Sequence, residues 1–266
     1  MEILEINSES RVVFCNIRND GAHIHMVLIF ILKDKDNDTD MKIVETVSFQ
    51  RKDLQYIKDG YKRLFKHEID NFGYSSYDKK LCIWTNRDSY HEIDLRSDKA
   101  MFHYTFHLQL SEEIIKSTIN RLSGPSDIIL QNNEVVIDMP SCFSIVFPEL
   151  IEYVDKDLCL VMIEISTPCF VIKRKFDINL DFIISLKNDI VKFVCGGIHN
   201  IDFSTEFIDI FFKYSGDGIE VSGDISDFSS PDMNEIKFTE LVHVDTLNLM
   251  YKSLCELQNY IEKMER

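Results

Sequence analysis

The chain has 266 residues, of which 45% are apolar and 28% charged, and its formal net charge is −16. This length predicts one or two domains, and the apolar fraction excludes a disordered chain. The acidic balance argues against direct binding to nucleic acid or to an anionic membrane surface, because both depend on clustered Lys and Arg.

The start of the chain and its cysteines predict a cytoplasmic protein. Residues 1–5 read Met-Glu-Ile-Leu-Glu and lack the basic and apolar regions of a signal peptide. The longest apolar run covers residues 26–32, much shorter than the ~20 residues of a membrane helix. Seven cysteines without a CxxC pair favour reduced core residues over a disulfide framework or a zinc ribbon.

In the first half, apolar runs predict strands over residues 23–32 and 42–49, followed by a helix with its apolar face between residues 54 and 65. After a polar loop, three further strands are predicted over residues 81–85, 90–95 and 102–110. The last of these alternates between apolar and polar residues, which is typical of a half-buried antiparallel strand. A short helix is then expected over residues 111–122 and ends at Gly124-Pro125.

The second half repeats this order. Strands are predicted over residues 158–165 and 169–176, then a helix from residue 180 that Gly196-Gly197 terminates. Three strands follow over residues 207–212, 219–225 and 236–244, the first two joined by a hairpin turn at residues 215–218. Asp245-Thr246 caps a final amphipathic helix.

The two halves predict an α+β protein of two similar units, each an antiparallel sheet with two packed helices in the order β-β-α-β-β-β-α. The first unit is expected over residues 1–130 and the second over residues 131–266. Leu54 and Ile57 are matched to Leu180 and Ile183, a shift of 126, and the last strands match with a shift of 134. The alternative is that two unrelated α+β units share this pattern by coincidence.

The acidic charge lies mainly in the second half. Residues 1–133 contain 18 basic and 21 acidic side chains, whereas residues 134–266 contain 11 and 24. Such a surface is either a solvated face or a docking surface for a basic partner. The candidate partner-binding residues cluster around the second hairpin: Asp217, Glu220, Asp224, Asp227 and Asp232.

No pattern of residues predicts a catalytic, metal or cofactor site. His23 and His25 share a strand face, as do His103 and His107, but no spacing supplies the further ligands of a zinc site. The Cys195 and His199 pair lies where Gly-Gly ends a helix and lacks a third orienting group. Trp84 and the 19 Phe are expected in the core, because they fall on strand and helix stripes.

Residues 150–262 resemble the immunity proteins of the WapI type, which protect bacteria from polymorphic contact-dependent toxins. The resemblance lies in the order of these segments: residues 206–212, residues 218–221, an Asp-rich loop, residues 236–238 and the helix start at residues 245–247. It implies a non-enzymatic inhibitor that covers the basic cleft of a nuclease toxin, and it carries over no catalytic residues. The chain is twice the length of one such unit, which puts simple one-to-one neutralisation in doubt.

Three other functions remain open. The first is a phage or mobile-element anti-defence protein that binds and inhibits a bacterial defence enzyme. The second is an enzyme whose site the motifs do not reveal, and the third is a self-assembling scaffold, a large homo-oligomer whose acidic face is merely solvated.

Overall fold

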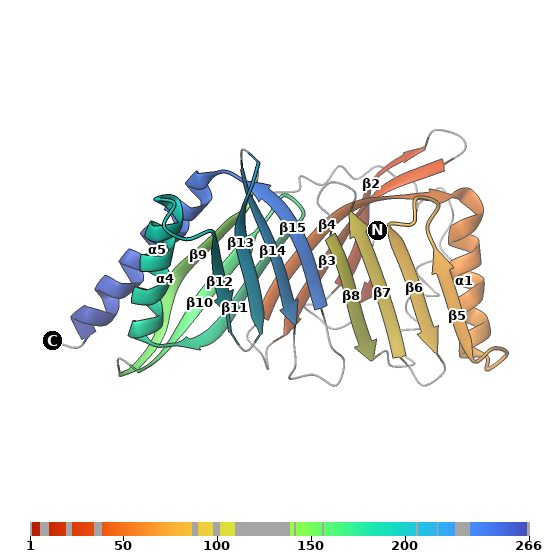
Figure 1. The fold of residues 1–266 in the computed structure, drawn as a ribbon. Helices are drawn as coiled ribbons and strands as arrows, with labels where there is room; N and C mark the ends of the chain where they lie inside the picture. The colour runs from red at the N-terminus through yellow and green to blue at the C-terminus, as the bar shows by residue number, and fades with distance from the viewer. Residues whose placement is uncertain are drawn as a thin grey trace. The chain divides into compact units, whose positions relative to one another are not determined.

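The computed structural model describes residues 2–5, 11–19, 23–34, 39–86, 90–97, 102–109, 139–140, 142–155, 157–205, 207–216, 218–226 and 235–264. Over these residues the protein is α+β, with three helices and mostly antiparallel sheets (Figure 1). The predicted fold class is confirmed at this level.

The chain divides into two compact units. The first consists of Met1–Leu32, Lys42–Asp138 and Ser226–Lys237, and the second of Lys33–Met41, Met139–Ile225 and Phe238–Arg266. Two short segments, residues 33–41 and 226–237, therefore belong to the unit opposite to the one that their position in the sequence suggests.

In the first unit, four neighbouring strands precede a helix and four follow it. The first four are β1 (Glu2–Glu5), β2 (Arg11–Asn19), β3 (His23–Asp34) and β4 (Thr39–Gln50). Helix α1 (Arg51–Phe65) comes next. The second four are β5 (Asn71–Ser75), β6 (Leu81–Asn86), β7 (Tyr90–Ser97) and β8 (Phe102–Gln109), which pair in chain order.

Helix α1 packs its apolar face on β5. Ile57, Tyr61 and Leu64 are buried at helical spacing, and the ring centroids of Tyr61 and Phe72 lie 5.6 Å apart. Gly60 lies within this contact: a Cβ atom there would come within 2.1–2.6 Å of the Phe72 ring. The glycine therefore lets a large aromatic side chain approach the helix backbone closely.

The second unit opens with β9 (Ser144–Asp155), β10 (Leu158–Ser166) and β11 (Phe170–Ile178), followed by helix α4 (Leu180–Val194). Four strands follow: β12 (Asn200–Ser204), β13 (Ile208–Ser215), β14 (Gly218–Ser226) and β15 (Glu235–Val242). The last helix is α5 (Val244–Met264), which packs on β9 and α4 (Figure 1). The hairpin predicted at residues 215–218 is confirmed, because Ser215 pairs with Gly218 and Gly216 has a φ of +60°.

The core of the second unit is rich in phenylalanine. Phe203 on β12 contacts three other aromatic rings at centroid distances of 5.8–6.5 Å, those of Phe147, Phe176 and Phe182. On α4 the buried residues are Ile183, Leu186, Ile190 and Phe193. Each buried aromatic ring contributes a large apolar area to the core.

The helices α1 and α4 begin and end 129 residues apart. Both are 15 residues long, and β5 and β12 follow them at the same distance. The buried positions Ile57, Tyr61 and Leu64 match Leu186, Ile190 and Phe193. The shift of 126 expected from the sequence was therefore wrong by three residues, close to one helical turn, which preserves the apolar pattern but misplaces each residue.

Both helices also end in the same way. His67 N–H bonds to Leu64 C=O and Glu68 N–H to Arg63 C=O; the matching residues 196 and 197 bond to Phe193 and Lys192. Residue 67 has a φ of +58° and Gly196 has a φ of +74°. The predicted stop at Gly196 is confirmed, and the first unit uses a histidine where the second has glycine.

Several elements differ from the sequence-based prediction. Four strands follow α1 and α4 and not three, because the five-residue strands β5 and β12 are too short and too polar to stand out. Strands β1, β2 and β9 were also missed. The helix expected over residues 111–122 lies outside the described residues. Trp84, expected in the core, is 49% exposed, because the period-two alternation of β6 turns it outward while Thr85 is buried.

Candidate functional site

Two of the five predicted partner-binding acids are described by the structure, and both lie on β14. Glu220 and Asp224 are half-buried and four residues apart, so both face the same side of the strand. The other three, Asp217, Asp227 and Asp232, lie outside the described residues.

The outward face of β12, β13 and β14 brings further carboxylates beside these two. Asp209 pairs directly with Asp224 across β13 and β14, and Ser204 of β12 pairs with Asp209. Asp202, two residues earlier on β12, is exposed on the same face. We call this surface the acidic face; its carboxylates are Asp202, Asp209, Glu220 and Asp224.

Phe211 lies in the middle of the acidic face. It pairs with Asp202 on one side and with Ser222 on the other, and its side chain is partly exposed. An aromatic ring surrounded by carboxylates offers both apolar contact and charge to a cationic partner. This phenylalanine was expected in the core, but the alternation of β13 turns its side chain outward.

Two lysines form ion pairs with acids, one on β13 in the second unit and one in the part of β15 that belongs to the first unit. Lys213 Nζ lies 2.6 Å from Glu220 Oε1, and Lys237 Nζ lies 2.5 Å from Glu235 Oε1 on β15. In both pairs the lysine side chain is about half exposed. Exposed ion pairs contribute only ~0–1 kcal/mol each, so the cations of a partner can replace these lysines at little cost.

The outward face of β5, β6 and β7 in the first unit has a shallow hollow of about 370 Å³. Its lining residues are Gly73, Tyr74, Ser75, Cys82, Ile83, Trp84 and Asp94. The Trp84 indole lies against Gly73, where a Cβ atom would come within 2.9 Å of the ring carbon Cε3. A glycine at this position thus gives the indole its place on the sheet.

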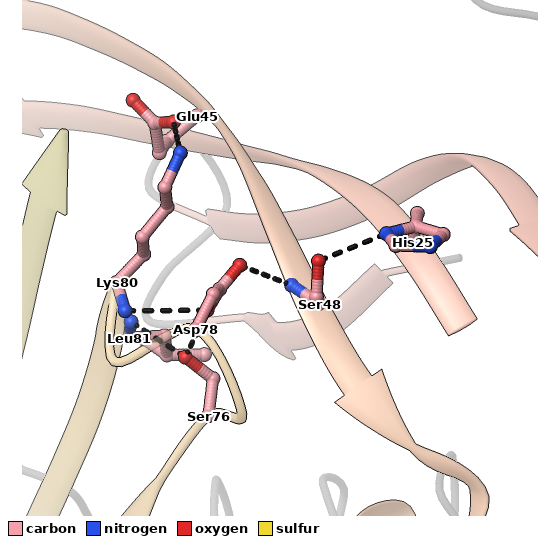
Figure 2. A network of polar contacts seen from close by, with 7 residues as sticks. All are labelled: His25, Glu45, Ser48, Ser76, Asp78, Lys80 and Leu81. Carbon is pink, nitrogen blue, oxygen red and sulfur yellow. Dashed lines mark hydrogen bonds and ion pairs between the residues drawn. The ribbon is translucent and has the colours of Figure 1, made fainter. Parts of the chain in front are cut away.

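A polar network ties the loop between β5 and β6 to β4 (Figure 2). The Asp78 carboxylate accepts hydrogen bonds from Ser48 N–H at 2.7 Å, Lys80 N–H at 3.2 Å and the Ser76 hydroxyl at 2.6 Å. The Ser76 hydroxyl also accepts the Leu81 N–H at 3.0 Å. Three donors on one carboxylate hold the loop in a single conformation.

The same network contains a buried ion pair between Lys80 Nζ and Glu45 Oε1 at 3.3 Å, with side chains 16% and 5% exposed (Figure 2). In the second unit the position matching Glu45 is Arg174, which is also buried. The Arg174 guanidinium lies 3.9 Å from the centre of the Phe207 ring, and Phe207 precedes β13 as Lys80 precedes β6. In both units, a residue on the strand before the helix contacts the residue that precedes the second strand after the helix, by an ion pair in the first unit and by a cation–π contact in the second.

At the other end of this network, His25 Nδ1 lies 2.9 Å from the Ser48 hydroxyl oxygen (Figure 2). Such a distance suits a base and a nucleophile. In a catalytic triad, however, the carboxylate orients the imidazole, whereas here Asp78 binds the backbone N–H of Ser48. The arrangement therefore favours a structural role, in which the hydroxyl links β3 to β4.

The remaining candidate residues do not come together in a site. His23 and His25 share a face as predicted, with ring centroids 6.3 Å apart. Cys195 and His199 are both exposed at the end of α4. In the part of the chain that the structure describes, no group of three or more His, Cys, Asp or Glu side chains is arranged to hold a metal ion. Within those same residues, no helix is long and apolar enough to cross a membrane.

Comparison of the chain with protein-family models, with curated proteins and with solved structures found no match.

Proposed function

We propose that this protein is a non-enzymatic inhibitor that binds a basic protein partner through the acidic face of its second unit, in the manner of an immunity protein. The partner is a nuclease toxin, and the complex forms in the cytoplasm. The observation that carries the proposal is the convergence of three aspartates around Phe211 on one sheet face, where Asp202 and Asp209 are exposed and Asp224 is half-buried.

The chemistry of the acidic face fits a partner that normally binds nucleic acid. A nuclease cleft presents Lys and Arg side chains to phosphates, and carboxylates on a rigid sheet can take the places of those phosphates. Neighbouring strands lie ≈4.8 Å apart, so paired acids such as Asp209 and Asp224 concentrate negative charge on a small area of the sheet. The net charge of −16 would also speed the approach of a basic partner at low salt.

We further propose that the two units are copies of one ancestral unit, of which the second acquired the acidic face. Three observations support this proposal: the constant shift of 129 from α1 through β5, the shared way in which α1 and α4 end, and the matched contacts of Glu45 and Arg174. Ser76 and Thr205 add a further match, because each bonds through its backbone N–H and side-chain oxygen to the first residue of the next strand.

A differential capture experiment tests the proposed function. The tagged protein, an Asp202→Lys/Asp209→Lys variant and a matched Glu152→Lys/Asp177→Lys control are each incubated with lysate of the native host. The control acids are exposed, on β9 and β11, and carry the same change of charge. We expect a basic protein that the wild type and the control retain and the acidic-face variant loses.

The captured protein is then purified and assayed for nuclease activity with and without the inhibitor. Inhibition of the nuclease by an equimolar amount of the wild-type protein supports the proposal. The electrostatic mechanism is supported if the association rate of the two proteins depends on salt and is lower for the acidic-face variant. Equal capture by all three proteins would show that the acidic face is not the binding surface. A captured enzyme that defends against phage, and not a toxin, would instead assign the anti-defence function.

A further inference from the structure

The hollow on the first unit combines an exposed aromatic ring with a carboxylate. Trp84 is 49% exposed and lines it, and exposed tryptophan is enriched at binding surfaces because its large ring offers apolar contact. Asp94 lines the same hollow, and its side chain is 17% exposed.

The sheet register separates these two groups by a fixed distance. Trp84 pairs with Glu92 across β6 and β7, and Cys82 pairs with Asp94, so Trp84 and Asp94 are diagonal neighbours on one face. Diagonal neighbours on adjacent strands are ≈7–8 Å apart. This spacing leaves room for a planar cation that stacks on the indole and points its N–H groups at the carboxylate.

The corresponding positions of the second unit carry the same two kinds of group. Asp209 pairs with Asp224 as Cys82 pairs with Asp94, and Phe211 follows Asp209 by two residues as Trp84 follows Cys82. Both units thus have an aromatic ring with a carboxylate at the diagonal position of the next strand, Trp84 with Asp94 and Phe211 with Asp224. The other residues around each pair differ between the units.

We propose that the hollow beside Trp84 and Asp94 binds an arginine side chain of the protein partner. The guanidinium stacks on the indole and donates hydrogen bonds to the Asp94 carboxylate. Arg96 approaches this carboxylate at 3.9 Å with a side chain that is 58% exposed, and a carboxylate has acceptor sites for more than one cation. The inference deepens the proposed function, on which it rests for the nature of the partner, and adds a contact on the first unit to the acidic face of the second.

Trp84 is the one tryptophan of the chain, so its indole N–H gives a single signal in an NMR spectrum of the full-length ¹⁵N-labelled protein. The probe is an acetylated and amidated Gly-Gly-Arg-Gly-Gly peptide, and the control peptide has citrulline in place of arginine, which keeps the shape without the charge. We expect the arginine peptide to shift the indole signal to saturation in the millimolar range, and the citrulline peptide to leave it in place.

Two variants separate the roles of the ring and the carboxylate. Asp94→Asn should lower the affinity for the arginine peptide about fivefold. Asp59→Asn, which makes the same change of charge at an exposed position on α1, should leave this affinity unchanged. Trp84→Phe should retain weaker binding, measured by calorimetry, because phenylalanine keeps an aromatic face. Circular dichroism checks that each variant is folded.

Equal shifts from the two peptides, or an Asp94→Asn affinity equal to that of the wild type, would overturn the inference. These outcomes are independent of the capture experiment, since the titration uses no partner and reports only on the first unit. Loss of capture through the acidic face together with an unresponsive Trp84 would retain the proposed function and reject the arginine site.

Discussion

The contact between Gly60 and Phe72 allows a sharp test of how α1 is held on its sheet. Gly60→Ala improves helix propensity by ~1 kcal/mol, and on an exposed helix it would stabilise the protein. Here the new methyl carbon would lie 2.1–2.6 Å from ring atoms of Phe72, which is only 5% exposed and is packed against Tyr61. Overpacking of this kind destabilises a core by ~1–3 kcal/mol, so we expect a net loss of about 1 kcal/mol in the free energy of unfolding.

The second unit indicates the compensating change. The positions that match Gly60 and Phe72 are Asp189 and Ile201, a larger residue on the helix and a smaller one on the strand. Phe72→Ile alone leaves a cavity and should lose about 1–2 kcal/mol. In the Gly60→Ala/Phe72→Ile variant the methyl group occupies part of that cavity. The double variant should therefore lose about 1 kcal/mol less free energy of unfolding than the sum of the two single-variant losses.

Urea unfolding followed by the fluorescence of Trp84 measures these values, because this tryptophan lies in the first unit. Lys52→Ala, an exposed change in the first turn of the same helix, serves as the control and should leave the midpoint almost unchanged. A Gly60→Ala protein as stable as the wild type, or additive losses in the double variant, would refute the reasoning.

Three further predictions concern single residues and titration. His67 and Gly196 both have positive φ, a conformation that costs less for glycine than for other residues. His67→Gly should therefore stabilise the first unit by about 1 kcal/mol, and Gly196→Ala should destabilise the second by a similar amount. Urea midpoints that shift in the same direction for both variants would contradict this. Burial raises the pKa of Glu240, so folding disfavours its charged form. Glu240→Gln should therefore raise Tm at pH 7, and this gain should disappear below the ordinary glutamate pKa. Burial raises the pKa of Tyr61 and, together with the Asp53 carboxylate, that of Tyr74, both beyond the usual tyrosine range. Stability should therefore fall as the pH rises above ~10, where the unfolded chain releases these protons. Near-ultraviolet absorbance should show a part of the tyrosine signal that ionises only as circular dichroism reports unfolding; complete tyrosine ionisation in the folded state would disprove the prediction.

The sequence predicted the longer elements because their apolar patterns are strong. Helix α4 and the paired strands around residue 216 were located from periodicity and from glycine, which are local signals. Strands β5 and β12 were missed because five residues with two buried side chains give too little pattern. The helix shift was misjudged because apolar residues recur at three and four positions, so two registers match almost equally well.

The outward faces of the sheets were harder to predict for a different reason. Alternation alone says that neighbouring residues face opposite sides, but not which side is buried, and an aromatic residue is by default assigned to the core. Trp84 and Phe211 were both misassigned in this way. Their exposure depends on which side of the sheet the rest of the unit covers, and this is a tertiary property that no short stretch of sequence contains.

The matched buried contacts of Glu45 and Arg174 have a consequence for how the chain reaches its folded state. Proteins with similar halves are prone to misassembly, in which a segment of one half docks into the other. If β11 replaced β4 beside Lys80, the Arg174 guanidinium would lie next to a second buried cation, which is unfavourable. If β4 replaced β11, the Glu45 carboxylate would lie against the electron-rich face of Phe207, which is also unfavourable. We therefore expect β4 and β11 each to favour the loop that it contacts in the folded protein, so that exchanged pairings are disfavoured while the chain folds.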